Sequence, residues 1–183
     1  ALKQPNGTVL KLAMTSYPVW IDMIYAYEQS HPHIHLEYNV ITIEALHSQQ
    51  PPLPWNFFLG ITEDIDSEYF QSSIVFPPER PVVLMSVRNP LSSRTEIRLE
   101  ELRNENFISV GKANSSAHNY MISLCRHAGF EPRKIYYGDY LMRVKLVQQN
   151  RGVNITTNLG ATVNAIPLDT ITTIPISSPI MTR

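Results

Sequence analysis

The stretch Val9-Leu-Lys-Leu-Ala-Met-Thr-Ser-Tyr-Pro18 decides the fold class, because it carries the chain from an apolar strand directly into a helix. Residues 9–14 are mostly apolar and have the length of one buried strand. Thr15 and Ser16 then offer hydroxyl groups of the kind that cap helices, and the proline two positions later suits a first helical turn. We therefore expect a strand over 9–14 and a helix that ends near Gln29.

Strand and helix continue to alternate along the first half of the chain. Every second residue over 34–40 is apolar or aromatic, which is the period of a strand. A short helix over 42–47 and a strand over 55–61 are expected next. Strand, helix, strand, helix and strand in this order predict a parallel α/β lobe.

The second half of the chain follows the same pattern, with buried strands expected over 81–87 and 107–110. Its clearest helix begins after Ser115 or Ser116, with apolar residues at helical spacing from Ala117 onward and Gly129 in the position of a helix stop. The remaining expected elements are strands over 73–76, 135–137, 153–157 and 170–176 and helices over 99–104 and 139–150.

The composition excludes several classes of protein. The chain has 183 residues and a formal net charge of −1, and 43% of its residues are hydrophobic, which is enough for a packed core. At roughly 100–200 residues per domain, this length predicts one domain or two small lobes. No apolar run approaches the roughly 18 residues that span a bilayer, and no signal peptide opens the sequence. A nearly neutral chain is a poor candidate for binding nucleic acid by itself.

The near-neutral total conceals two oppositely charged segments. Residues 12–79 contain nine acidic residues and no Lys or Arg, whereas residues 80–151 contain twelve basic and six acidic residues. Two lobes of opposite charge, which attract each other within or between chains, would explain this asymmetry. The alternative is two differently charged surfaces without a role.

The first expected helix is apolar on nearly all sides. Over residues 19–29 only Asp22, Glu28 and Gln29 are clearly polar, although one core-facing stripe needs little more than 100° of a helix. A partner subunit that covers the outer face is the preferred interpretation. A helix enclosed within its own lobe fits the pattern equally well.

Sequence motifs give no support for an enzyme, a metal site or a cofactor. No glycine pair forms a Gly-x-Gly nucleotide motif, and no Gly-x-Ser-x-Gly motif is present. His31, His33 and His35 lie close in sequence, but a polar turn explains them better than a metal site, because no further ligand has a fixed spacing. Cys125 excludes an internal disulfide framework, agrees with a reducing cytoplasm, and lies in an apolar helical stripe that predicts core packing.

Hydroxyl residues recur where expected strands end and helices begin. Thr15, Thr42 and Ser109 occupy such positions, and Lys112 and Ser115 follow Ser109 closely. Helix N-termini carry unpaired N–H groups, and ligands of open α/β sheets bind at the carboxyl ends of the strands. For any single residue helix capping is the better explanation, but their convergence predicts a ligand site that suits an anion.

The order of the motifs resembles the effector-binding domain of LysR-type transcriptional regulators. The stretch Leu124-Cys-Arg-His-Ala-Gly-Phe-Glu-Pro132 is similar to the family's "c..aGf.P" passage. The other matches, in the family's order, lie at 7–14, 25–37, 58–61, 80–92, 99–108 and 146–153.

This resemblance implies a type 2 periplasmic-binding-protein fold, in which two α/β lobes are joined by two crossover strands. Lobe I would comprise residues 1–72 plus 159–183, and lobe II residues 77–156. It also implies the effector-sensing domain of a bacterial regulator. Family dimers place lobe I of one chain beside lobe II of the other, so we expect a homodimer or higher homo-oligomer. DNA would be contacted only through a winged-helix domain that lies outside this chain.

The resemblance implies further that a small effector binds between the lobes, without a cofactor or a metal. An extracytoplasmic solute-binding protein of the same fold stays open as the alternative. The candidate ligand-binding residues are Thr15, Ser16, Tyr17, Thr42, Ser109, Lys112, Ser115 and Thr157.

Overall fold

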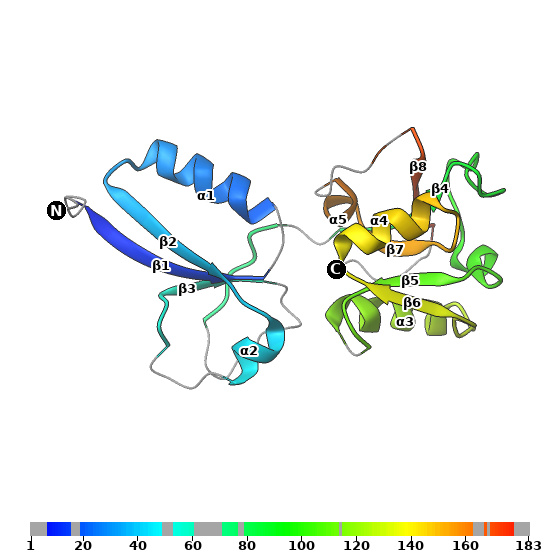
Figure 1. Ribbon diagram of the computed structural model, residues 1–183, viewed down its shortest axis with the longest axis horizontal. Helices are drawn as coiled ribbons and strands as arrows, with labels where there is room; N and C mark the ends of the chain where they lie inside the picture. The colour runs from blue at the N-terminus through cyan, green and yellow to red at the C-terminus, as the bar shows by residue number, and fades with distance from the viewer. Residues whose placement is uncertain are drawn as a thin grey trace. The chain divides into compact units, whose positions relative to one another are not determined.

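The chain forms two compact units, Ala1–Ser72 and Ser73–Arg183, in a computed structural model (Figure 1). Each unit contains its own strands and its own helices. In the helices that the structure describes, no segment is long and apolar enough to cross a membrane. The structure describes residues 7–15, 19–48, 53–60, 71–76, 79–113, 115–162, 167 and 169–177.

The first unit is a parallel sheet with helices between its strands. Its strands lie in the order β2-β1-β3, and β1 pairs in parallel with both neighbours. This arrangement confirms the predicted strand-helix alternation. The elements are β1 (Thr8–Met14), α1 (Val19–Ser30), β2 (Ile34–Val40), α2 (Ile43–Ser48) and β3 (Phe57–Leu59).

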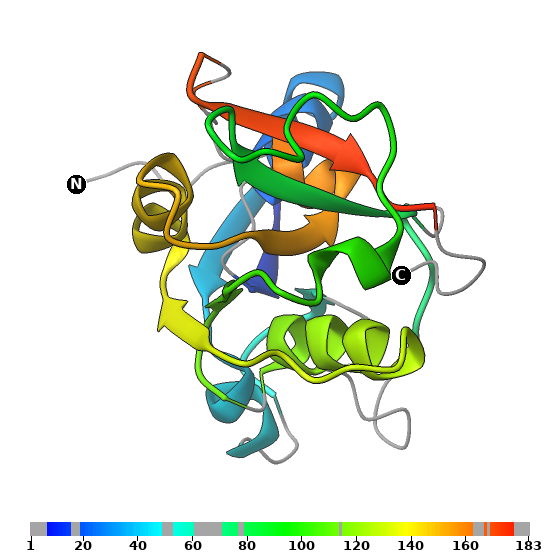
Figure 2. The same ribbon diagram turned by 90° about the vertical axis from the view of Figure 1, so that its right-hand side faces the viewer.

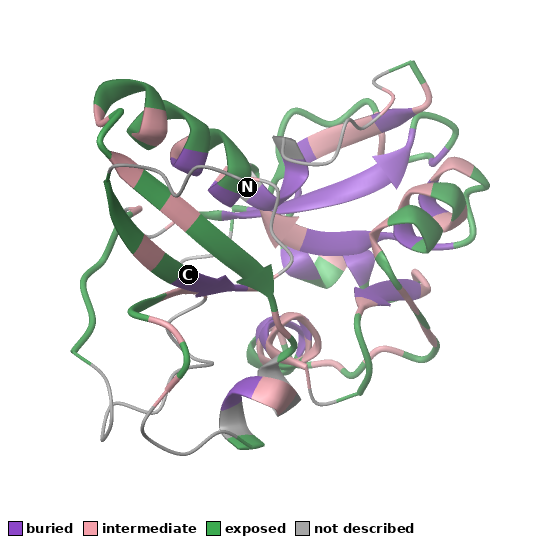
Figure 3. Ribbon diagram, turned by 60° about the vertical axis from the view of Figure 1, so that its left-hand side comes forward, coloured by how far each residue is buried: buried purple, intermediate pink, exposed green. Residues whose placement is uncertain are grey.

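Burial in the first unit concentrates at the carboxyl end of β1. Ala13 and Met14 are 0% and 2% exposed, and α1 contributes Trp20 and Ile24 to the buried residues. Most of α1 is exposed in Figure 3, and Tyr25 has 65% of its surface accessible. The first unit therefore does not enclose α1 on all sides, although the sequence left that possibility open.

The second unit combines a mixed set of strands with helices on both sides. Sheet β7-β4-β8 is antiparallel, and β5 pairs in parallel with β6. Figure 2 turns this unit toward the viewer. In that sheet β4, in green, lies between β8, in red, and β7, in orange. The elements are β4 (Pro81–Ser86), η2 (Leu99–Leu102), β5 (Phe107–Val110), α3 (Ser116–His127), β6 (Ile135–Gly138), α4 (Tyr140–Gln148), β7 (Asn154–Thr157), α5 (Asn158–Thr162) and β8 (Ile171–Pro175).

Two hydrophobic clusters fill the second unit. Phe107 of β5 belongs to the cluster that contains Met121 and Leu124 of α3. Its neighbour Ile108 belongs to the other cluster, together with Val147 of α4. Because successive side chains of a strand point to opposite faces, β5 holds α3 on one side and α4 on the other (Figure 1).

Some elements differ from the sequence expectation. Residues 73–76 form no strand, and the expected helix over 99–104 is a short 3-10 helix, η2. Contacts group β8 with the second unit. The reason is that β8 pairs with β4 along its whole length, which buries Ile171 and Ile174.

Replacing Phe107 by Ala tests the importance of the α3 cluster. Phe107 is fully buried, and its ring centroid lies 6.1 Å from that of Phe130. We expect the free energy of unfolding in urea to fall by about 3–5 kcal/mol, because a cavity replaces the ring. Val87→Ala is the control: Val87 is 44% exposed, and its loss should change stability by about 0.5 kcal/mol or less. Equal losses in both variants would contradict the assigned core.

Candidate functional site

The predicted hydroxyl residues of the first unit lie where two neighbouring strands end. The Thr15 N–H donates to the Leu59 carbonyl over 3.0 Å, and the Ile41 N–H donates to the Met14 carbonyl over 2.9 Å. Thr15 and Thr42 therefore follow adjacent strands at the carboxyl edge of one sheet. Ser16 and Tyr17 lie outside the described residues.

Thr42 caps the helix that follows it. Its Oγ1 accepts a hydrogen bond of 3.1 Å from the Ala45 N–H, three residues on, at the start of α2. This is the ordinary bond of a helix cap. Thr15 is half-buried at the end of β1, so its environment differs from that of the exposed Thr42.

The predicted residues of the second unit also share one sheet edge. β5 and β6 run in parallel and end together, with the Gly111 N–H donating to the Gly138 carbonyl over 2.9 Å. A parallel bridge joins Phe107 of β5 to Val153, the residue that precedes β7. The carboxyl ends of β5, β6 and β7 therefore lie at the same edge, which brings Ser109, Lys112, Ser115 and Thr157 to one side of the unit.

Two of these residues are helix caps. Ser115 Oγ accepts from the His118 N–H over 3.2 Å and lies 3.1 Å from the Val110 carbonyl, to which it donates. Thr157 Oγ1 accepts from the Gly160 N–H over 3.2 Å at the start of α5. Capping therefore accounts for the hydroxyl oxygens of both residues.

Ser109 differs from the capping hydroxyls. It is 2% exposed on β5, and its Oγ has no hydrogen-bond partner in the described part of the chain. Buried hydroxyl groups are nearly always hydrogen-bonded, so an unpaired one needs an explanation. Among the candidate residues described, only this serine combines nearly complete burial with an unpaired oxygen.

His118 of α3 is a further polar residue of this unit that was not predicted as a site residue. Its Nδ1 is buried and has no hydrogen-bond partner among the described residues, and its ring centroid lies 5.6 Å from that of Tyr137. A signal was present in the sequence, because His118 precedes Met121 by three residues and Cys125 by seven. These are helical spacings that place a polar ring on the buried stripe of α3.

The charges of this edge favour an anion. Lys112 is exposed, and α3 has no acidic residue in its first turn. The positive end of the helix dipole is therefore not offset there by a carboxylate of the same helix. Asp139 follows β6, but its Oδ1 accepts from the Met142 N–H over 2.8 Å as the cap of α4.

Basic residues also surround Tyr136, which lies near the beginning of β6. Lys134 Nζ lies 4.7 Å from the centroid of the Tyr136 ring, and Arg151 Cζ lies 5.8 Å from it. A hydrogen bond from Lys134 and a weaker effect of a hydrogen bond from Arg151 lower the pKa of Tyr136. This cluster shows where part of the positive charge of residues 80–151 lies.

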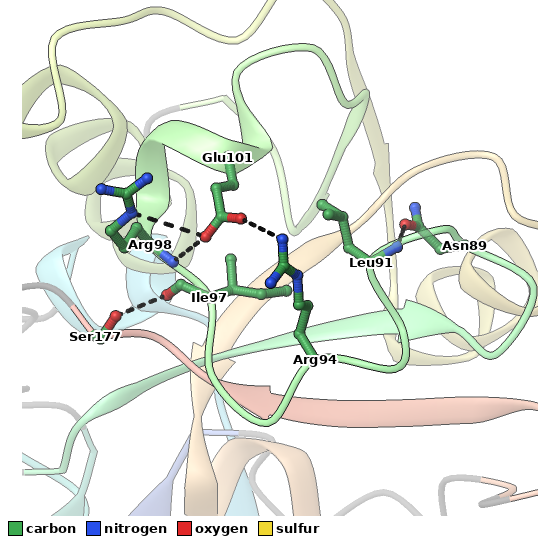
Figure 4. A network of polar contacts seen from close by, with 7 residues as sticks. All are labelled: Asn89, Leu91, Arg94, Ile97, Arg98, Glu101 and Ser177. Carbon is green, nitrogen blue, oxygen red and sulfur yellow. Dashed lines mark hydrogen bonds and ion pairs between the residues drawn. The ribbon is translucent and has the colours of Figure 1, made fainter.

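A second group of basic residues shares one carboxylate. Glu101 lies between Arg94 and Arg98 in Figure 4, with ion-pair distances of 3.6 Å and 3.9 Å. The Arg98 N–H also donates to Glu101 over 3.0 Å. Surface pairs of this kind contribute little to stability. Because two guanidinium groups share one carboxylate, the group has an excess of positive charge.

The remaining motifs behave as structural residues. Cys125 is fully buried in the α3 cluster, and burial raises the pKa of its thiol to about 12, so core packing is confirmed. His31 stacks on Tyr27 with ring centroids 4.3 Å apart. In the described ranges no group of three or more His, Cys, Asp or Glu side chains could hold a metal ion.

Residues 3–165 of the chain match the family model described as the LysR substrate binding domain. No curated protein matches the chain by sequence. The chain spans 64% and 62% of the length of two similar LysR family structures from Pseudomonas aeruginosa.

Solved structures of this kind are similar in fold. HinK, a LysR family transcriptional regulator from Pseudomonas aeruginosa, aligns with 96% of this chain and 62% of its own, at 16% identity and a TM-score of 0.79. The BenM effector binding domain with its effector benzoate aligns over 94% of this chain and 78% of its own, at 15% identity and a TM-score of 0.72. The effector binding domain of QuiR in complex with shikimate aligns over 97% and 84%, at 16% identity and a TM-score of 0.71.

Replacing Ser115 by Ala tests the capping role. We expect the free energy of unfolding in urea to fall by about 1 kcal/mol, because the His118 N–H loses its acceptor. Ser116→Ala, one residue into α3, is the control and should have little effect. Ser115→Asp should retain much of the stability, because a carboxylate also accepts from the first turn. Wild-type stability of Ser115→Ala would show that the cap is unimportant.

Proposed function

The chain belongs to the family of LysR substrate-binding domains, and on this basis we propose that it senses a small effector for a bacterial transcription regulator. The fold is the type 2 periplasmic-binding-protein-like α/β fold that the sequence predicted. Family membership favours this function over the alternative, an extracytoplasmic solute-binding protein. The regulator would bind DNA through a winged-helix domain outside these 183 residues, and it would act in the cytoplasm.

Hydroxyl groups at the carboxyl ends of parallel strands, in each of the two units, are the observation that carries this proposal. In an open α/β sheet this edge is where ligands bind. The residues that we propose for effector binding come from both units. These are Thr15, Ser16, Tyr17 and Thr42 of the first unit and Ser109, Lys112, Ser115 and Thr157 of the second.

An anionic effector suits the charges of the second unit. Lys112 and the uncompensated N-terminus of α3 lie at the same sheet edge as Ser109. Benzoate and shikimate, which bind the related domains of BenM and QuiR, both carry a carboxylate group. We propose that this protein binds its effector without turnover and without a cofactor.

We further propose that the chain acts as a homodimer. Ile21 and Tyr25 of α1 are 42% and 65% exposed, and Leu141 and Met142 of α4 are 79% and 51% exposed. Helix α1 belongs to the acidic segment and α4 to the basic one. Contact between α1 of one copy and α4 of another would cover both apolar faces and bring opposite charges together.

A screen of small carboxylates by thermal shift tests the sensing function. A ligand at 100 times its dissociation constant should raise the free energy of unfolding by about 2.7 kcal/mol. Thr15→Val should weaken binding of that ligand by about tenfold, because one hydrogen bond to a charged group is lost. Thr8→Val, at the exposed start of the same strand, is the control. An unchanged affinity in Thr15→Val would remove Thr15 from the site.

Light scattering tests the dimer. We expect a mass of twice the 20.9 kDa chain, and a higher proportion of monomer as ionic strength rises, because salt screens the opposite charges. Tyr25→Glu should give the monomer, because it places a charge in the covered face. Ile74→Glu is the control, since Ile74 is 77% exposed in a segment without regular structure. A monomeric wild type at all concentrations and salt levels would refute the dimer.

A further inference from the structure

The apolar contact between α3 and β5 ends in two polar side chains. Phe107 of β5 packs in one cluster with Met121 and Cys125 of α3. Two residues beyond Phe107, the strand continues with Ser109, and three residues before Met121 the helix carries His118. Both elements therefore change from apolar to polar at the same end of their contact.

Ser109 and His118 lie on the same side of the β5–β6 pair. Side chains alternate along a strand, so Ser109 lies on the α3 side with Phe107, and its partner in the parallel register is Tyr137. The His118 ring contacts the Tyr137 ring with centroids 5.6 Å apart. The hydroxyl and the imidazole therefore border the same small region beside Tyr137.

Both side chains have a buried polar atom without a partner. Ser109 Oγ and His118 Nδ1 are inaccessible, and neither has a hydrogen bond within the described residues. Burying such an atom unpaired is unfavourable, since its hydrogen bonds to water are lost and not replaced. Two such atoms at the end of one hydrophobic cluster indicate that a group from outside the chain completes their bonds.

We propose that Ser109 and His118 bind a carboxylate group of the effector, an inference that rests on the proposed function. A serine hydroxyl can donate one hydrogen bond, and an imidazole with its proton on Nδ1 can donate another. A carboxylate offers two acceptor oxygens and no donor, so one such group satisfies both atoms. The first turn of α3, which lacks an acidic residue, favours the negative charge.

The stability of the ligand-free protein gives the first test. Removing an unpaired hydroxyl should leave the melting temperature of Ser109→Ala unchanged or higher. Ser123→Ala is the matched control, because Ser123 Oγ donates to the Tyr120 carbonyl over 2.8 Å. Its melting temperature should fall by about 2–4 °C for a chain of this length. An equal fall in Ser109→Ala would overturn the proposal, because it would show that the protein itself pairs the hydroxyl.

Acetate binding followed by the imidazole nitrogen resonances of the histidines gives the second test. His118→Leu identifies the His118 signals by their loss. Acetate, added to about 100 mM, should shift these signals saturably with a millimolar dissociation constant, and the neutral analogue acetamide should not. Ser109→Ala should weaken acetate binding about tenfold, and Ser123→Ala should not weaken it. The proposal would be overturned if acetate did not shift the His118 signals, or if it shifted them equally in the wild type and in Ser109→Ala. Either result would indicate a bound water instead.

The results also separate this inference from the proposed function. In one outcome an effector stabilises the chain, and Thr15→Val weakens its binding whereas Ser109→Ala and His118→Leu do not. Effector sensing then stands, and the carboxylate pair is refuted. If acetate binds as expected but no carboxylate of the thermal-shift screen binds more tightly than acetate, the pair stands and effector sensing fails.

Discussion

Parallel pairing of β5 with β6 is the constraint on which the second unit depends. The register fixes the face of every side chain, so that Phe107 faces α3, Ile108 faces α4, and Ser109 returns to the α3 side. A shift by one residue would exchange these faces and bury the wrong set. The same pairing also brings the ends of β5 and β6 together, where the candidate site lies.

Most of the fold could be predicted from local patterns. Strict alternation predicted β2, and apolar residues at helical spacing between Ser115 and Gly129 predicted α3. The sequence of 73–76 resembles a strand, but a strand needs a partner for its backbone, and the described structure provides none there. The pairing of β8 with β4 could not be predicted, because residues about 90 positions apart leave no local signal of their contact.

The candidate site was predicted in its residue types but not in its bonding. Thr42, Ser115 and Ser109 look alike in sequence, since each is a hydroxyl residue near a strand end. In the structure the first two accept bonds from helix N–H groups, whereas Ser109 is buried without a partner. His118 was missed because the surrounding stripe is apolar, although its position on that stripe is what buries its Nδ1.

Charge and apolar surface have different roles in the proposed dimer. Exposed charges at a protein interface mainly direct the approach and select the orientation, whereas buried apolar side chains supply most of the affinity. Tyr25 on α1 and Leu141 on α4 are apolar or aromatic residues that remain largely exposed in the single chain. Helix α1 lies in the acidic segment and α4 in the basic one. Segments of the same charge on two copies therefore repel each other, and segments of opposite charge attract. This pattern favours an antiparallel pair over a parallel one.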